Sequence, residues 1–393
     1  MQLRIFTPPW PLLLGASSLL FLMMVASYAP TPLYPLYQEQ WGLTDSQIGL
    51  AFSVYAASVV VILLFLGGMS DRYGRRNTLL IATLTLGAAL IILACATTFP
   101  LLLLGRFIQG ISAALATGAA AATLMESHPG GLARGALLNT FSVAIGAAVG
   151  PIMAGSFAAG SSYPLVVPYL IIAAFVPVPL LFLIRATDSA PKQRAARLLQ
   201  AIRVPRHIWA PFSVAAAALI GTNLCIAIYG SFGSNIAASV GWTTEVLSGL
   251  LVSIVLVMFA VVQPFSRNVP PKISMFAGIV LSVIGWAMTS VAAMAAISPL
   301  MLIGAITTGG GAGLCLMGAA ALVGMISPLG RSAEIYSAFL LIAYITIVVA
   351  ALIAGPLIGL ISISAVLIFA SLVCVLLTIY VVYGSRRWLM LAH

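Results

Sequence analysis

Twelve apolar runs follow one another along this chain of 393 residues, with only short connections between them. One bilayer crossing needs about 20 mostly apolar residues, so each run is long enough to span. Only 6% of the residues are charged, whereas a soluble domain carries about 25%. The sequence therefore predicts an all-α integral membrane protein with 12 transmembrane helices and no separate soluble domain. We expect these helices near 11–30, 47–67, 77–97, 100–124, 135–158, 164–185, 208–231, 244–265, 273–296, 299–325, 333–356 and 361–383.

The basic residues predict the orientation, because Lys and Arg concentrate in the cytoplasmic loops of membrane proteins. With the N-terminus in the cytoplasm, sixteen of the 17 Lys and Arg residues fall on that side, and the other, Arg106, lies inside the fourth span. We therefore expect a multi-pass protein of an inner (plasma) membrane with both termini in the cytoplasm. The net charge of +10 follows from this asymmetry and does not indicate nucleic-acid binding.

Two weak internal repeats predict that the chain consists of two similar halves. Residues 42–50 resemble residues 241–250, and Gly150-Pro151 with Gly155 resembles Gly355-Pro356 with Gly359. Halves repeated in the same orientation are a known plan for transporters. We expect a six-helix half at 1–185, a cytoplasmic linker at 186–207 and a second six-helix half at 208–393.

The loop between the second and third spans is the most specific motif. Gly74 allows a tight turn that a β-carbon would hinder. Asp71 is an acceptor for a neighbouring arginine or a helix N-terminus, and Glu126 is the expected partner of Arg75 or Arg76. The loop residues that carry the motif are Gly67, Asp71, Arg72, Gly74, Arg75 and Arg76.

These residues match the loop pattern Gly-x-Leu-Ala-Asp-Arg-x-Gly-Arg-Lys of the major facilitator superfamily, with Met69 and Ser70 as departures. The resemblance extends over essentially the whole chain and implies that family's fold of two six-helix pseudo-repeats. It also implies that the loop, together with Glu126, acts as a conformational latch. The corresponding stretch of the second half, from Ser266 to Lys272, contains no acid, so the latch is expected in the first half alone.

The fourth span resembles a second pattern of the same family. Its matching residues are Leu102, Arg106, Gln109, Gly110, Ser112, Ala113 and Ala114. An arginine within a span must face protein or water, because exposure to lipid costs several kcal/mol. Two roles stay open for Arg106: structural hydrogen bonding to helix ends, or a direct part in handling substrate or protons.

The fifth span resembles the family's antiporter motif through Gly146, Gly150, Pro151 and Gly155. Small residues at this spacing let two helices approach closely. The resemblance implies an exporter that exchanges its substrate for protons. Ordinary packing of glycine and alanine is the alternative reading of the same residues.

Polar residues within the spans are the candidates for binding a substrate between the halves. We expect Tyr28, Gln109, Asn139, Asn223 and Tyr229 to do so, because a buried amide or phenol needs a partner. The first span has no carboxylate at mid-membrane, which argues against a cation-selective site. The candidates for a titrating group are Asp71 and Glu126 inside, or Glu39 and Asp45 outside.

Together these features predict a secondary transporter that works by alternating access, not an enzyme. Proton-coupled export of a small organic compound or drug is the favoured function. The alternatives are uptake of a sugar or organic acid by symport or uniport and, more remotely, a membrane scaffold or sensor without flux. We expect a monomer that needs no cofactor and no metal.

Overall fold

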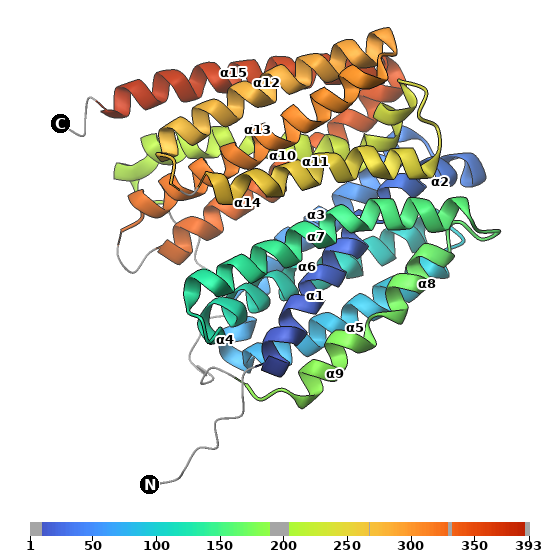
Figure 1. Ribbon diagram of the computed structural model, residues 1–393, viewed down its shortest axis with the longest axis vertical. Helices are drawn as coiled ribbons and strands as arrows, with labels where there is room; N and C mark the ends of the chain where they lie inside the picture. The colour runs from blue at the N-terminus through green and yellow to red at the C-terminus, as the bar shows by residue number, and fades with distance from the viewer. Residues whose placement is uncertain (1–9, 189–203, 267, 329–331, 390–393) are drawn as a thin grey trace.

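The computed structural model describes residues 10–188, 204–266, 268–328 and 332–389 (Figure 1). Within that part of the chain, 12 helical segments are long and apolar enough to cross a membrane, as predicted. Most of the expected linker, residues 189–203, lies outside the described residues. The spans are Trp10–Trp41, Asp45–Leu66, Arg75–Ala94, Phe99–Ser127, Leu132–Ala159, Val167–Arg185, Arg206–Ala238, Glu245–Phe265, Pro271–Ala295, Ser298–Ile326, Glu334–Leu360 and Ile363–Gly384.

The helices form two bundles that lie side by side (Figure 1). Helices suit this environment because lipid offers no partner for an unbonded backbone group. The first bundle contains α1 (Trp10–Tyr28), α2 (Tyr34–Trp41), α3 (Asp45–Leu66), α4 (Met69–Tyr73), α5 (Arg75–Ala94), α6 (Phe99–Ser127), α7 (Leu132–Ala159), α8 (Val167–Ala174) and α9 (Pro177–Arg185). The second contains α10 (Trp209–Ala238), α11 (Glu245–Phe265), α12 (Pro271–Ala295), α13 (Ser298–Ile326), α14 (Ser332–Leu360) and α15 (Ile363–Leu389).

The first span is longer than the predicted 11–30 and is broken in the middle of its course. After α1 the chain forms a short 3-10 helix, η1 (Thr31–Leu33), and then continues into α2. Pro30 and Pro32 have no N–H to donate to the preceding turn, so the regular α-helical ladder stops there. This break leaves carbonyl groups at the end of α1 without their usual partners.

Matching N-caps confirm the first of the two sequence repeats. The Thr44 hydroxyl accepts from the backbone N–H of Gln47 at 3.3 Å and forms part of a capping box at the start of α3. The Thr244 hydroxyl accepts from the N–H of Leu247 at 3.3 Å at the start of α11. Each cap satisfies one of the orphan donors of its helix.

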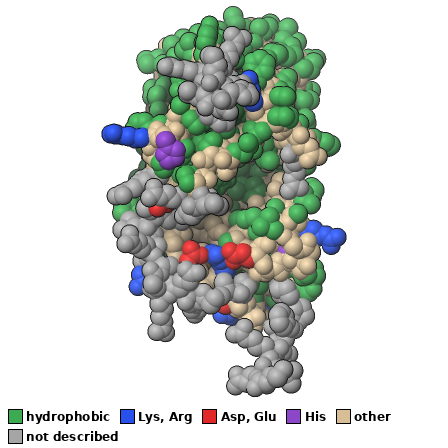
Figure 2. Space-filling model, turned by 90° about the vertical axis from the view of Figure 1, so that its left-hand side faces the viewer, with side chains coloured by type: hydrophobic (Ala, Val, Ile, Leu, Met, Phe, Trp, Pro, Cys, Tyr) green, Lys and Arg blue, Asp and Glu red, His purple; other side chains and the backbone are tan. Residues whose placement is uncertain are grey.

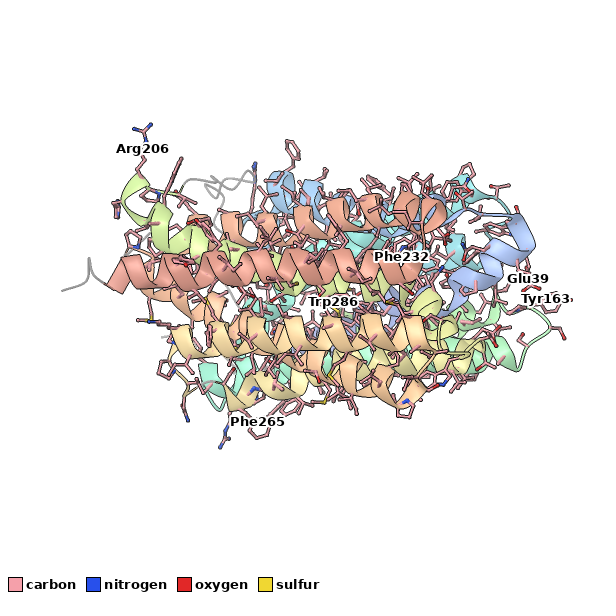
Figure 3. All side chains as sticks on the ribbon, turned by 90° about the horizontal axis from the view of Figure 1, so that it is seen from above. Glu39, Tyr163, Arg206, Phe232, Phe265 and Trp286 are labelled. Atoms are coloured by element: carbon pink, nitrogen blue, oxygen red, sulfur yellow. The ribbon has the colours of Figure 1, made fainter. Side chains whose placement is uncertain are left out.

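The molecule has two ends, which Figure 3 separates clearly. The end that carries the Gly67–Arg76 loop, Arg206 and Phe265 is called the basic end below, and the opposite end, with Glu39 and Tyr163, is called the far end. The first helix, α1, begins and the last helix, α15, ends toward the basic end (Figure 1). The two ends differ in how the halves meet, and that difference defines the candidate site.

Candidate functional site

Near the far end, α3 of the first half packs directly on the backbone of α14. A Cβ placed on Gly355 would lie 2.6 Å from the carbonyl oxygen of Asp45, and one on Gly49 would clash with the carbonyl of Ala351. The Ser53 hydroxyl donates to the carbonyl of Val348 at 3.1 Å. Glycines at both crossing points therefore let the two backbones touch.

The same arrangement recurs between α7 and α11. A Cβ on Gly155 would clash with the carbonyl of Glu245, and one on Gly249 with the carbonyl of Pro151. The Ser253 hydroxyl donates to the carbonyl of Ala148 at 2.6 Å. Gly249 and Ser253 of α11 thus make the same kinds of contact in this crossing as Gly49 and Ser53 of α3 make in the other.

This symmetry corrects the second sequence repeat. Gly355 occupies the contact position of Gly155, not that of Gly150. Gly359, which the sequence comparison matched to Gly155, has no atom of another described helix within 4 Å of its Cβ position. The similarity of the Gly-Pro pairs is misleading because both halves carry a proline at this level, but at different registers.

A third crossing joins the break in the first span to α10. The Thr31 hydroxyl donates to the carbonyl of Gly230 at 2.6 Å, and the Ser234 hydroxyl donates to the carbonyl of Thr31 at 2.9 Å. α10 is kinked at this level, where Phe232 has a φ of −122° and a ψ of 18°. The Asn235 side chain adds a bond of 3.1 Å from Nδ2 to Oδ1 of Asp45.

These contacts close the far end, whereas the basic end is open. All the side-chain hydrogen bonds that join described residues of the two halves belong to the three crossings just given. Both salt bridges found in the described part of the chain lie within the first half. Figure 2 looks onto the basic end and shows a recess between the halves.

A cavity of about 220 Å³ lies between the halves, with residues of α1, α3, α10, α13 and α14 around it. Its wall is mostly apolar and aromatic, as is usual for small-molecule sites. The polar groups on it are neutral hydroxyls and one amide. The lining residues are Met24, Ser27, Tyr28, Phe52, Tyr55, Ala56, Leu219, Thr222, Asn223, Ile226, Leu316, Tyr336, Phe339, Leu340, Ala343, Tyr344 and Ile347.

Two of the five predicted substrate residues, Tyr28 and Asn223, line this cavity. The expectation is corrected for Gln109, whose amide is buried and bonded to Arg106 and to a carbonyl of α1. It is also corrected for Tyr229, whose hydroxyl lies 3.0 Å from that of Thr289 in the core of the second half. Asn139 is half-buried on α7 and is not part of the lining.

Five of the cavity residues that were not among the predicted substrate residues are aromatic. Phe52 and Tyr55 of α3 face the cavity, as do Tyr336 and Tyr344 of α14. All of them lie in strongly apolar spans, where an aromatic residue is also a common choice for packing against neighbouring helices. No signal in a single sequence separates these two environments.

Arg106 is fully buried behind the cavity wall and repairs the broken end of α1. Its Nη1 donates to the carbonyl of Ser27 at 3.2 Å and to Oε1 of Gln109 at 2.6 Å. Gln109 in turn donates from Nε2 to the carbonyl of Ala26 at 2.7 Å. Pro30 cannot donate to that carbonyl, so the pair supplies the missing donors. This geometry supports the structural role among the two that the sequence left open.

The glycines of the predicted antiporter motif pack against neighbouring helices. A Cβ on Gly150 would lie 2.5 Å from the carbonyl oxygen of Val25, and one on Gly146 would clash with the carbonyl of Phe21, both on α1. Gly155 meets α11 of the second half instead. The motif thus connects the helix that carries the proline break with the crossing between the halves.

Arg75 organises the Gly67–Arg76 loop at the basic end. Its Nη1 lies 2.7 Å from Oδ1 of Asp71 and donates to the Ser70 hydroxyl at 2.6 Å, and its Nη2 lies 3.1 Å from Oε1 of Glu126. Gly74 turns the chain between α4 and α5 at a φ of +98°, a conformation that L side chains rarely adopt. The partner of Glu126 is therefore Arg75. These contacts hold α4, α5 and α6 together and do not reach the second half.

Arg76 has a separate role that the sequence did not indicate. Its Nε donates to the carbonyl of Leu183 at 2.8 Å and its Nη2 to that of Ile184 at 3.0 Å. Both carbonyls belong to the last turn of α9, where a cation is favourable. Arg72 instead lies over the ring of Tyr73, with 5.6 Å from its Cζ to the ring centre.

Comparison with known proteins agrees with this architecture. A family model described as Major Facilitator Superfamily matches residues 16–278. The chain therefore belongs to the Major Facilitator Superfamily; it is a multi-pass membrane transporter and not an enzyme.

Two relatives and one solved structure illustrate the similarity. Over 79 residues the chain is 37% identical to the multidrug resistance protein MdtL of Shewanella sp. (strain ANA-3), a stretch that covers 20% of each chain. Over 77 residues it is 35% identical to the probable sulfoacetate transporter SauU of Cupriavidus necator, which covers 20% of this chain and 18% of the relative. The matches thus span about a fifth of each relative's length.

The fold resembles the crystal structure of a bacterial homologue of the human lysosomal transporter Spinster in an inward-facing and unoccupied conformation. The TM-score is 0.78 at 13% identity, and the match covers 98% of both chains.

Proposed function

We propose that this protein exports a small organic compound through a bacterial inner membrane by alternating access, in exchange for protons. The observation that carries the proposal is the central cavity, which is closed at the far end and open toward the basic end. A site between two halves that rock about it is the usual arrangement of such transporters. One chain holds the complete cavity, so a monomer suffices.

The basic end lies in the cytoplasm under this proposal, so the structure is the inward-facing state. The charge distribution supports this orientation, because Arg72, Arg75, Arg76 and Arg206 all lie at that end. In this state the contacts of Arg75 stay within the first half, which leaves the second half free to move away.

The orientation is testable with the cysteines of the chain. Cys95 is exposed and follows the end of α5 that lies away from the basic loop, whereas Cys225, Cys315 and Cys374 are buried. We expect a membrane-impermeant maleimide to label Cys95 in intact cells. In a Cys95→Ser background, Phe265→Cys at the basic end should react only after the membrane is permeabilised. The reverse pattern would invert the assignment.

Export is favoured over uptake by two arguments. Gly146, Gly150, Pro151 and Gly155 resemble the family's antiporter motif, and the short stretch similar to MdtL links the chain to a multidrug resistance protein. Uptake of an organic acid is the second candidate, because SauU is a probable sulfoacetate transporter.

Proton coupling supplies enough energy for the export step. One proton that crosses roughly 100 mV releases about 2.3 kcal/mol, which supports about a 50-fold gradient of substrate at 1.36 kcal/mol per tenfold. The four acids proposed for the titration divide between the ends: Asp71 and Glu126 lie at the basic end, and Glu39 and Asp45 lie at the far end.

Inverted membrane vesicles with an acidic interior provide the test. A ligand is first selected by its thermal stabilisation of the purified protein. We expect the vesicles to accumulate that ligand while the pH gradient lasts and to lose it when a protonophore is added. No accumulation in the vesicles, together with uptake by intact cells, would replace export by import. Absence of flux in both would favour a scaffold or sensor.

A further inference from the structure

We propose that the central site is selective for organic anions, that is, for a carboxylate-bearing molecule with an apolar body. The inference rests on the proposed function and names the class of substrate that the same cavity takes. It follows from where the charges of the protein lie relative to that cavity.

Among the residues that the structure describes, the wall of the cavity carries no negatively charged side chain. None of the seven acidic residues of the sequence is among its lining residues. A cationic ligand would therefore enter an apolar site without a carboxylate to pair with, at a large cost in lost hydration.

The charge buried closest behind the wall is positive. Arg106 has no exposed surface, and among the described residues no carboxylate forms a salt bridge with it. Its bonds go to the Ser27 carbonyl at the end of α1, to the Ala51 carbonyl of α3 and to Gln109, and among the described residues its buried Nη2 has no hydrogen-bond partner. A helix C-terminus offers about half a negative charge, so the guanidinium is only partly compensated.

Two side chains connect this charge to the cavity. The Arg106 Cζ lies 4.6 Å from the centre of the Tyr55 ring and 5.6 Å from that of Phe52, and both rings face the cavity on α3. The Tyr55 hydroxyl lies 3.0 Å from the Ser27 hydroxyl, and Arg106 donates to the Ser27 carbonyl. The field of a charge acts strongly over such distances in a medium of low dielectric constant.

This arrangement places the anionic group of the ligand at the part of the cavity formed by Ser27, Tyr28 and Tyr55. The structure shows no bond from a described residue to the hydroxyls of Tyr28 and Tyr344, so both are available as donors. Hydrogen bonds to a charged acceptor are about twice as strong as neutral ones. The rest of the cavity, with Phe339 and Ile347, suits an apolar body.

Aromatic cavities also bind cations through the faces of their rings. Here the ring faces of Tyr55 and Phe52 already lie beneath the Arg106 guanidinium. A second cation beside the same rings would be repelled by the first. The geometry therefore favours the anion over a cation of equal size.

The test compares three probes that share a naphthalene body and differ in charge, each with the purified full-length protein. The probes are 2-naphthoate, the neutral 2-naphthamide and the cationic (2-naphthyl)trimethylammonium, and equilibrium dialysis gives the Kd of each. We expect the Kd of the carboxylate to be at least about tenfold lower than the other two. Equal or tighter binding of the amide or the cation, or no binding of the carboxylate, overturns the inference.

Two pairs of variants test whether the charges around the cavity cause the preference for the carboxylate probe. Arg106→Lys should keep the preference for the carboxylate, and Arg106→Gln should abolish it. Because loss of the arginine can also prevent folding, a second pair changes the cavity wall. Asn223→Asp places a carboxylate among the lining residues and should abolish the preference, whereas Asn223→Leu should retain it. An unchanged preference in Asn223→Asp counts against the electrostatic explanation.

The vesicle assay separates this inference from the proposed function. Proton-driven accumulation of the cationic probe alone would support export and overturn the anion selectivity. Selective binding of 2-naphthoate without any transport would support the anion selectivity and overturn the proposed export.

Discussion

The far end and the basic end hold their helices by different means. At the far end the two halves meet backbone to backbone at Gly49, Gly155, Gly249 and Gly355, with a few hydrogen bonds, one of them to the carboxylate of Asp45. At the basic end the ion pairs of Arg75 stay inside the first half. Under the proposed mechanism this contact opens in every cycle, and close packing can separate without leaving a buried charge unpaired.

The largest effect on transport is expected from Gly150→Leu, because this change disturbs the packing of α7 against α1, on which both ends of the molecule depend. The Cβ alone would lie 2.5 Å from the Val25 carbonyl, so α7 and α1 must separate. We predict loss of transport in the vesicle assay together with a lower Tm. Gly118→Leu is the control, since no other residue lies within 4 Å of its Cβ position. A fully active Gly150→Leu protein would remove the antiporter-motif argument.

Gly355→Leu should disturb the packing of the far end alone. The side chain would enter the backbone of α3 at Asp45, so this end could not close. We predict that transport is abolished while the protein still folds, and that maleimide reacts faster at this end. Gly359→Leu is the matched control on the same helix, because its Cβ position is open. Similar transport by the two variants would show that the glycine crossing is not the closure.

Asp71→Asn perturbs the basic end. It removes the charge that faces Arg75 at 2.7 Å, while Glu126 keeps its own contact. The side chain of Asp71 is 44% exposed, so the pair contributes at most about 1 kcal/mol to stability, and expression should be normal. We predict that transport falls by about tenfold, equivalent to about 1.4 kcal/mol in the balance of states.

The control for Asp71→Asn is Asp188→Asn at the same end. Among the described residues, Asp188 accepts only from the backbone N–H of Arg76, at 3.4 Å. Its substitution should change transport less than about twofold, as is usual for exposed positions. Equal effects of the two substitutions would indicate a general loss of surface charge rather than a latch.

Asp45→Asn should have the smallest effect. The asparagine still accepts from Gln38 and Asn235 through its side-chain oxygen, but the bonds lose their charge assistance. We predict that the far end opens more often, by about fivefold or about 1 kcal/mol, as measured by maleimide labelling near that end. Unchanged labelling would show that the glycine contacts alone supply the free energy that keeps the far end closed.

Much of this comparison could be predicted from the sequence, because the signals were local. Apolar length defined the spans, and the Thr44-x-x-Gln47 pattern is that of a capping box at the start of α3. The acid–arginine pattern indicated that Glu126 pairs with Arg75 or Arg76, and the structure shows Arg75. Each of these depends on residues whose placement follows from one helix or one turn.

The remaining features depend on how the helices are rotated against each other. Phe52 and Tyr55 were indistinguishable from packing residues until α3 was placed beside Arg106. The donation by Arg76 to the end of α9 joins positions more than one hundred residues apart. The correspondence of Gly355 to Gly155 is visible only from the helix crossings, because the similarity of the Gly-Pro pairs suggested another register.

The most direct test of alternating access is a pair of distances measured on one protein by electron spin resonance. One pair of spin labels, at Tyr73 and Phe265, spans the two halves at the basic end, and the other, at Tyr163 and Ile361, spans them at the far end. All four side chains are exposed, so the labels should not disturb the packing. A ligand and a pH change that drive transport should shorten the first distance and lengthen the second. Two distances that change in the same direction, or not at all, would contradict the account.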